Sequence, residues 1–140
     1  MTANAKQVVE DFYASGGPTA VPERLREVFA ERYVSHTSPP GTPAGPSGAI
    51  ALRAWLEATF SDLEYELVEL VAEGDRVAVY TMMRGTHTGH GLGVAPTGKR
   101  FAAEQMHLIH VADGQIVEHW GVRDDAGMMR QLGLISDAGS

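Results

Sequence analysis

The chain has 140 residues, of which 44% are hydrophobic and 21% charged, and it carries a formal net charge of −7 and no cysteine. This length and composition predict a single globular domain over residues 1–140, in which roughly two thirds of the unfolded surface is buried. The negative charge argues against nucleic acid and anionic membranes as partners, and the lack of cysteine excludes disulfides and thiolate metal sites.

The N-terminal segment is not expected to be a signal peptide or a membrane span. Glu10 and Asp11 interrupt its apolar residues, so it does not match a secretory signal peptide. No apolar run approaches the roughly 20 residues that a membrane span needs. Together with the absence of cysteine, this predicts a soluble, cytoplasmic protein.

The first half of the chain shows helical periodicity. Apolar residues at helical spacing predict a first helix around Val8–Tyr13, and a second is predicted over residues 22–30. Residues 33–36 have an extended pattern, and residues 37–48 form a loop rich in proline, glycine and serine, typical of a pocket lid or rim. Ser47 is a good N-cap for a third helix that extends to about Phe60.

The second half has a period of two. Strands are predicted at residues 63–72, 76–85, 101–112 and 115–123, followed by a short helix at 125–132 and a frayed tail at 136–140. Helices followed by consecutive strands with short turns predict an α+β domain. The expected architecture is a curved, mostly antiparallel sheet covered by three N-terminal helices, with an apolar pocket between sheet and helices.

Short motifs spread over nearly the whole chain resemble one known family. They are YVSH at 33–36, GPSG at 45–48, SDL at 61–63, AEGDRV at 72–77, GTHTG at 85–89, PTGK at 96–99, DGQIVEHW at 113–120, Asp124, and QLG at 131–133. In this order they resemble the SnoaL-like polyketide cyclases, also labelled ester cyclases, of the nuclear-transport-factor-2-like superfamily. The resemblance implies a cone-shaped fold around a hydrophobic pocket and a homodimer or homotetramer.

The resemblance also implies an activity. The best-known family members close a ring of an aromatic polyketide by intramolecular aldol condensation, without cofactor or metal, and an aspartate at the position of Asp124 serves as general acid/base. Two departures are Ser61, where proline is common, and His110, where arginine is frequent. Because a fold does not fix a reaction, isomerisation, dehydration, epoxide opening or hydroxylation in the same pocket remain alternatives, as does a non-catalytic binding or dimerisation module.

Asp124 is the first catalytic candidate. If the last strand stays regular, Trp120, Val122 and Asp124 share one face. Aspartate is a preferred helix cap, and two adjacent aspartates permit a division in which Asp125 caps the short helix and Asp124 points into the pocket as a general base. The non-catalytic alternative predicts instead an exposed Asp124 and a closed cavity.

His107 is the second catalytic candidate. It shares a strand face with Gln105, and is either a core histidine or a pocket donor that stabilises a substrate oxyanion. His110 falls on the opposite face, so His107 and His110 do not chelate one ion and no metal site is predicted. The residues predicted to bind the substrate are Gln105, Trp120, His36, Tyr13 and Trp55.

Overall fold

The computed structural model describes residues 4–136, so the tail predicted to be frayed lies outside the described residues except for Ser136. The helices in this part are α1 (Ala5–Ala14), the short 3-10 helix η1 (Gly17–Thr19), α2 (Pro22–Val28), α3 (Pro46–Thr59) and α4 (Asp125–Gln131). The strands are β1 (Phe29–Ser35), β2 (Phe60–Glu73), β3 (Arg76–His87), β4 (Arg100–Ala112) and β5 (Gln115–Arg123). Among residues 4–136, no helix is long and apolar enough to cross a membrane.

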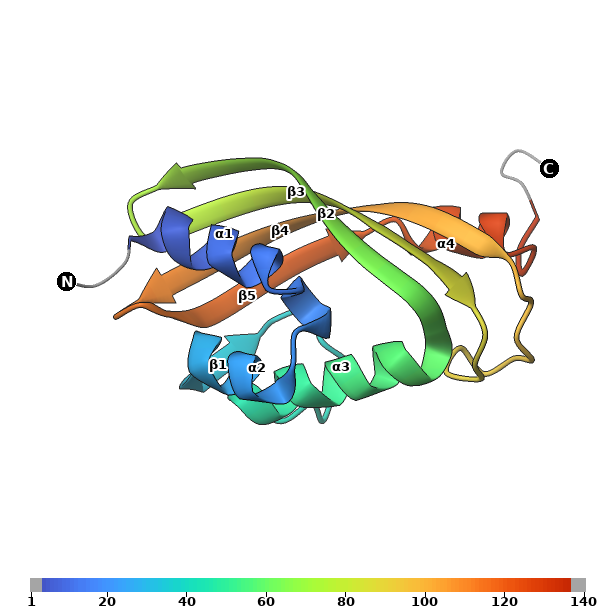
Figure 1. Ribbon diagram of the computed structural model, residues 1–140, viewed down its shortest axis with the longest axis horizontal. Coiled ribbons are helices and arrows are strands. Elements are labelled where there is room, and N and C mark those ends of the chain that lie inside the picture. The colour runs from blue at the N-terminus through green and yellow to red at the C-terminus, as the bar shows by residue number, and fades with distance from the viewer. Residues whose placement is uncertain (1–3, 137–140) are drawn as a thin grey trace.

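The strands form one curved sheet in the order β1-β5-β4-β3-β2, and α1, α2 and α3 lie on the same side of it (Figure 1). Only β1 and β5 are parallel; the other neighbouring pairs are antiparallel. The turn between β4 and β5 is made by Asp113 and Gly114, both with positive φ, which is the backbone that a two-residue hairpin turn requires. The predicted α+β architecture is therefore confirmed.

Two helix boundaries differ from the sequence prediction. Helix α2 ends at Val28 because Phe29 is already extended and begins β1. Helix α3 begins at Pro46, and its N-cap is Gly45 instead of Ser47. Gly45 has φ +73°, its N–H donates to the carbonyl of Tyr33, and an added Cβ would lie 2.7 Å from the Glu31 carbonyl oxygen. The backbone approach to β1 thus fixes where the helix starts.

The inner face of β4 divides the core into two parts. Phe101 and Ala103 at one end belong to an apolar cluster with Leu56, Phe60, Met83, Met128 and Leu132. Ile109 and Val111 at the other end belong to a larger cluster built on α1, α2, β1 and β3. The two inward residues between these ends are polar, Gln105 and His107. The polar inward side chains of β4 therefore lie between two apolar clusters.

Candidate active site

A cavity of about 630 Å³ lies over these polar residues. Its wall is mostly apolar and is contributed by α1, α3, the inner face of the sheet and the start of α4. Residues 38–43 of the loop between β1 and α3 line it as well, as predicted for a rim segment. Of the residues predicted to act in a pocket, Tyr13, Trp55, Gln105 and His107 line this cavity.

A chain of hydrogen bonds crosses the cavity wall from β1 to β4. Ser35 Oγ lies 2.8 Å from His119 Nδ1, and His119 Nε2 lies 2.7 Å from His107 Nδ1. His107 Nε2 is in turn 2.9 Å from Gln105 Oε1, and the Gln105 amide nitrogen donates to the Met83 sulfur at 3.3 Å. The two histidine rings come from adjacent strands and together form a half-buried pair.

The chemistry at the two ends of the chain assigns its protons. A thioether sulfur has no proton to donate, so the amide nitrogen of Gln105 faces Met83 and its oxygen faces His107. His107 must then carry its proton on Nε2, and its Nδ1 accepts from His119 Nε2–H. His119 consequently accepts the Ser35 hydroxyl proton on Nδ1. All donors point in one direction, from Ser35 towards Gln105.

Both histidines are neutral at physiological pH. Burial is the main cause that lowers the pKa of His107 to about 3 and that of His119 to about 4. The neighbouring His119 and the positive charge of Arg123 lower the pKa of His107 further. Because neither ring is protonated, His107 offers a neutral N–H donor inside an apolar cavity.

Gly121 makes the space that the histidine pair occupies. It is the cross-strand partner of His107, and an added Cβ would lie 2.5 Å from His107 Nδ1 and 3.0 Å from His119 Nε2. Any other residue at this position would push the two rings apart. The glycine is therefore part of the site, although it contributes no functional group.

Three tyrosines add neutral hydroxyl groups to the cavity wall. Burial raises the pKa of Tyr13 and Tyr65 far above the usual range and that of Tyr33 to about 12, so all three stay protonated. Tyr65 donates to the sulfur of Met83 at 3.4 Å, a weak partner that a ligand oxygen can replace.

The structure reverses the division expected for the two aspartates. Asp124 is the N-cap of α4: its Oδ1 accepts from the N–H of Gly127 at 2.8 Å, and the residue is exposed. Asp125, expected to be the cap, is exposed as well, but it lines the cavity. The cap geometry requires Asp124 to be non-helical and to fold its carboxylate back onto the first turn, which turns it away from the cavity. The exposure of Asp124 matches the non-catalytic alternative, whereas the open cavity contradicts it.

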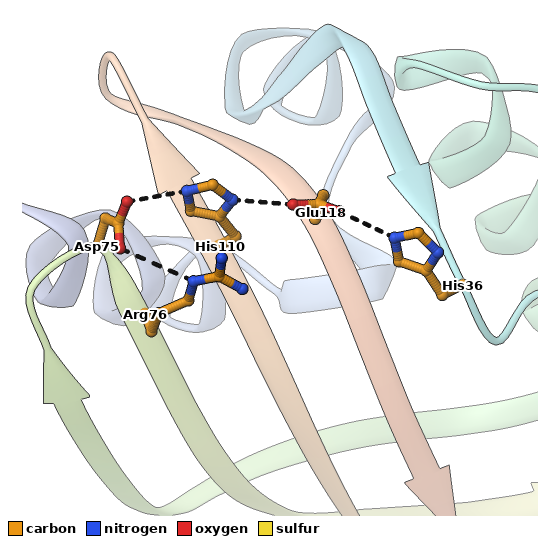
Figure 2. A network of polar contacts seen from close by, with 5 residues as sticks. All are labelled: His36, Asp75, Arg76, His110 and Glu118. Carbon is orange, nitrogen blue, oxygen red and sulfur yellow. Dashed lines mark hydrogen bonds and ion pairs between the residues drawn. The ribbon is translucent and has the colours of Figure 1, made fainter.

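Trp120 and His36 were predicted to bind the substrate in the pocket, but the structure places both outside it. Trp120 does share a face with Val122, but that face is the outer one, where Trp120 stacks on the His36 ring with centroids 4.6 Å apart. Figure 2 shows His36 in a surface network, in which Glu118 bridges His36 and His110. Since adjacent strand residues alternate, an outward Trp120 places His119 inward. The prediction took the wrong one of two neighbouring residues.

Sequence reasoning missed three cavity residues on β5 and α4: His119, Arg123 and Asp125. The alternation of side chains along β5 could have identified His119 and Arg123, because residues 119, 121 and 123 share the face opposite Trp120 and Val122. It was obscured because apolar Trp120 and Val122 favoured an inward assignment for the wrong face. His110 was correctly placed opposite His107, and it pairs with Asp75 and Glu118 at the surface.

The curved sheet, the helices on one side and the apolar cavity between them define an α+β fold of the nuclear-transport-factor-2-like type. The family model for SnoaL-like polyketide cyclases matches residues 4–132. The chain belongs to this family.

Relatives of known sequence or structure agree with this membership. The chain is 38% identical over 94 residues to nogalonic acid methyl ester cyclase of Streptomyces nogalater, covering 66% of this chain and 70% of that protein. It is 41% identical over 81 residues to the aklanonic acid methyl ester cyclase AcmA of Streptomyces galilaeus, covering 57% of this chain and 56% of that protein. Thus the match spans only a little over half the length of AcmA.

Solved structures match over nearly the full chain. TsrD from Streptomyces laurentii superposes with a TM-score of 0.80 at 30% identity, covering 93% of this chain and 95% of its own. IdmH from Streptomyces antibioticus superposes with a TM-score of 0.79 at 33% identity, covering 94% of this chain and 99% of its own. These similarities confirm the predicted family and fold.

Proposed function

We propose that this protein is a polyketide cyclase that closes a ring of a hydrophobic, oxygenated substrate by intramolecular aldol addition. The observation that carries the proposal is the apolar cavity with a neutral, hydrogen-bonded histidine pair in its wall. Relatives named for the cyclisation of nogalonic and aklanonic acid methyl esters support the substrate class. The addition transfers a proton and forms a carbon–carbon bond without net oxidation, so the reaction requires no cofactor. The cytoplasm is the proposed location.

The first chemical step needs a base for a carbon-bound proton next to a carbonyl. Asp125 is the carboxylate among the cavity-lining residues, and we assign it this role. Deprotonation gives an enolate whose carbon attacks a second carbonyl of the same molecule. The proton held by Asp125 then passes to the new alkoxide oxygen, which restores the carboxylate. One group thus acts as base and then as acid.

The enolate oxygen needs a donor that is already in place. His107 Nε2–H fits this role, because its present acceptor, Gln105 Oε1, is a neutral amide that a more negative substrate oxygen can displace. His119 acts as a positioning residue: it fixes the His107 tautomer that carries the proton on Nε2. Donors that are preorganised in a cavity of low dielectric stabilise developing charge most effectively.

Asp124, favoured by the sequence as the base, receives a positioning role in this proposal. By capping α4 it fixes the helix start from which Asp125 and Met128 reach the cavity. Its loss should weaken the helix by about 1 kcal/mol and lower turnover only indirectly. The two adjacent aspartates therefore provide a matched pair of variants.

The test compares Asp125→Asn with Asp124→Asn, using aklanonic and nogalonic acid methyl esters as substrates and chromatography of the cyclised product. Asp125→Asn should lower kcat by roughly 100-fold or more at unchanged Tm. Asp124→Asn should lower Tm and leave most of the turnover. The opposite pattern would move the base to Asp124. If the folded wild-type protein gave no cyclised product with either ester, the cyclase assignment would fail for this substrate class.

We further propose that two copies associate through the outer face of the sheet. Its centre exposes apolar side chains from adjacent strands: Val122 is 70% exposed, Met106 54% and Leu108 39%. Along β4 the outer face runs from Glu104 through the apolar centre to His110. If a two-fold axis lies in the interface and crosses β4, Glu104 of one copy comes to lie opposite His110 of the other. Such a self-complementary patch suits a second copy of the same chain.

A further inference from the structure

Arg123 brings a positive charge to a cavity that is otherwise apolar. It is the last residue of β5, it pairs with Gln105 across the strands, and it lies on the inward side with His119 and Gly121. Among the cavity-lining residues, Arg123 and Asp125 are the two with a full charge, because the lining histidines are neutral. The cation therefore sits at the end of the cavity next to α4.

The guanidinium of Arg123 is not used within the fold. Elsewhere in the described chain, Arg24, Arg53, Arg76 and Arg84 each form an ion pair with a carboxylate. Arg26, Arg32 and Arg130 form none within that part of the chain, but they do not line the cavity. Arg123 forms no ion pair and no side-chain hydrogen bond with any residue from 4 to 136, Asp125 included. In a chain with net charge −7, an unpaired arginine at a cavity is a site for an external anion.

The charge of Arg123 reaches across the cavity. It lowers the pKa of Tyr13, Tyr33 and Tyr65 against the larger opposing effect of burial, and it contributes to the low pKa of His107 and His119. These five side chains come from α1, β1, β2, β4 and β5. A positive charge that acts on these side chains favours a ligand that carries negative charge.

We propose that Arg123 binds an oxyanion substituent of the substrate, a carboxylate or an ionised phenol, at the α4 end of the cavity. The planar guanidinium donates two parallel N–H bonds to the two oxygens of a carboxylate, a geometry that a lysine cannot supply. The apolar body of the substrate then lies over the histidine pair, between α1 and α3. This inference names a substrate class for the proposed cyclase and rests on that function, but its test measures binding alone.

The test uses two ligands with the same ring system, anthraquinone-2-carboxylic acid and its methyl ester, titrated by calorimetry at pH 7.5. Wild-type protein should bind the acid roughly tenfold more tightly than the ester, a modest preference because Arg123 is exposed to solvent. Arg123→Gln should reduce the acid-to-ester ratio to about one and leave the ester Kd unchanged. Arg123→Lys should keep part of the preference, and higher ionic strength should reduce it.

Two controls separate the charge of Arg123 from charge in general. Arg130→Gln removes an arginine of α4 that does not line the cavity, and the ratio should stay at the wild-type value. Asp125→Asn removes the neighbouring negative charge, and the preference for the acid should increase. An equal ratio in wild type and Arg123→Gln would overturn the proposal, as would a wild-type protein that binds neither ligand.

A third result would also overturn it. If Arg123→Gln left both Kd values unchanged and lowered only kcat for a neutral ester, the guanidinium would act on the enolate and not on a substituent. Failure of the cyclase proposal is distinguishable from all of these results. In that case wild type would give no cyclised product, whatever its preference between the two ligands.

Discussion

The two faces of strands β4 and β5 carry the same residue types and use them differently. On the inner face, His107 and His119 contact each other in the wall of an apolar cavity. On the outer face, His110 and His36 each contact the carboxylate of Glu118. His107 and His110 are only three residues apart. Both residues are half-buried, but the His107 ring lies in the cavity wall and the His110 ring pairs with carboxylates on the outer face.

Burial changes what an imidazole offers. Inside, it holds the pKa of both histidines well below 6.5, so the pair can only be neutral and serves as a directed set of donors and acceptors. Outside, hydrogen bonds from His110 and His36 lower the pKa of Glu118, which stays an anion. An exposed network of this kind contributes little to stability. The comparison therefore predicts that chemistry depends on the inner face and assembly on the outer one.

The largest expected effect is a difference in kcat between variants of the two histidines of β4. His107→Gln removes the Nε2–H that we assign to the enolate oxygen, and kcat should fall by roughly 100-fold or more. His110→Gln changes the solvent side of the same strand and should leave kcat within about twofold. The measurement is turnover of aklanonic acid methyl ester, with circular dichroism as a check of folding. Equal losses in both variants would contradict the assignment of chemistry to the inner face.

The next effect is on stability in acid. The unfolded chain takes up protons on His107 and His119 near pH 6.5, whereas the folded protein does so only near pH 3 and 4. Their contribution is therefore present in full above pH 6.5 and is lost as the pH falls. Between pH 6.5 and 5, the free energy of unfolding should drop by roughly 1 kcal/mol per pH unit for each histidine.

Urea denaturation at pH 7.5, 6 and 5 measures this slope. The double variant His107→Gln/His119→Gln should show a clearly flatter dependence of unfolding free energy on pH, whatever its absolute stability. An unchanged slope in the double variant would show that the inner pair is not held neutral by burial.

Much of the fold was predictable because it depends on local patterns. Strand β5 was predicted with its observed bounds, Gln115–Arg123, from its alternation and from the Asp113-Gly114 turn. The start of α3 was not, since it depends on the close approach of Gly45 to the backbone of Glu31, a contact between distant segments. Where tertiary contacts set a boundary, propensity alone places it a residue or two away.

The candidate site was predicted in part, and the errors have one cause. Gln105 and His107 were placed correctly because β4 alternates polar and apolar residues along its whole length. On β5, alternation was recognised but the inner and outer faces were exchanged, which selected Trp120 and Asp124 in place of His119 and Arg123. Which face is inner depends on where the helices pack, and this information is absent from the strand itself. An outer face with its own apolar patch made the exchange possible.

The smallest expected effect on turnover comes from that outer patch. Val122→Glu places a charge at the centre of the proposed interface, where burial without a partner is unfavourable by several kcal/mol. Sedimentation at micromolar concentration should show a dimer for wild type and a monomer for this variant, with kcat within about twofold. Val21→Glu is the matched control, since Val21 is 54% exposed and lies at the start of α2, away from the sheet's outer face. If Val122→Glu kept the wild-type mass, the outer face would not be the interface. If it lost the dimer and also lost turnover, the separation between an inner face for chemistry and an outer face for assembly would be wrong.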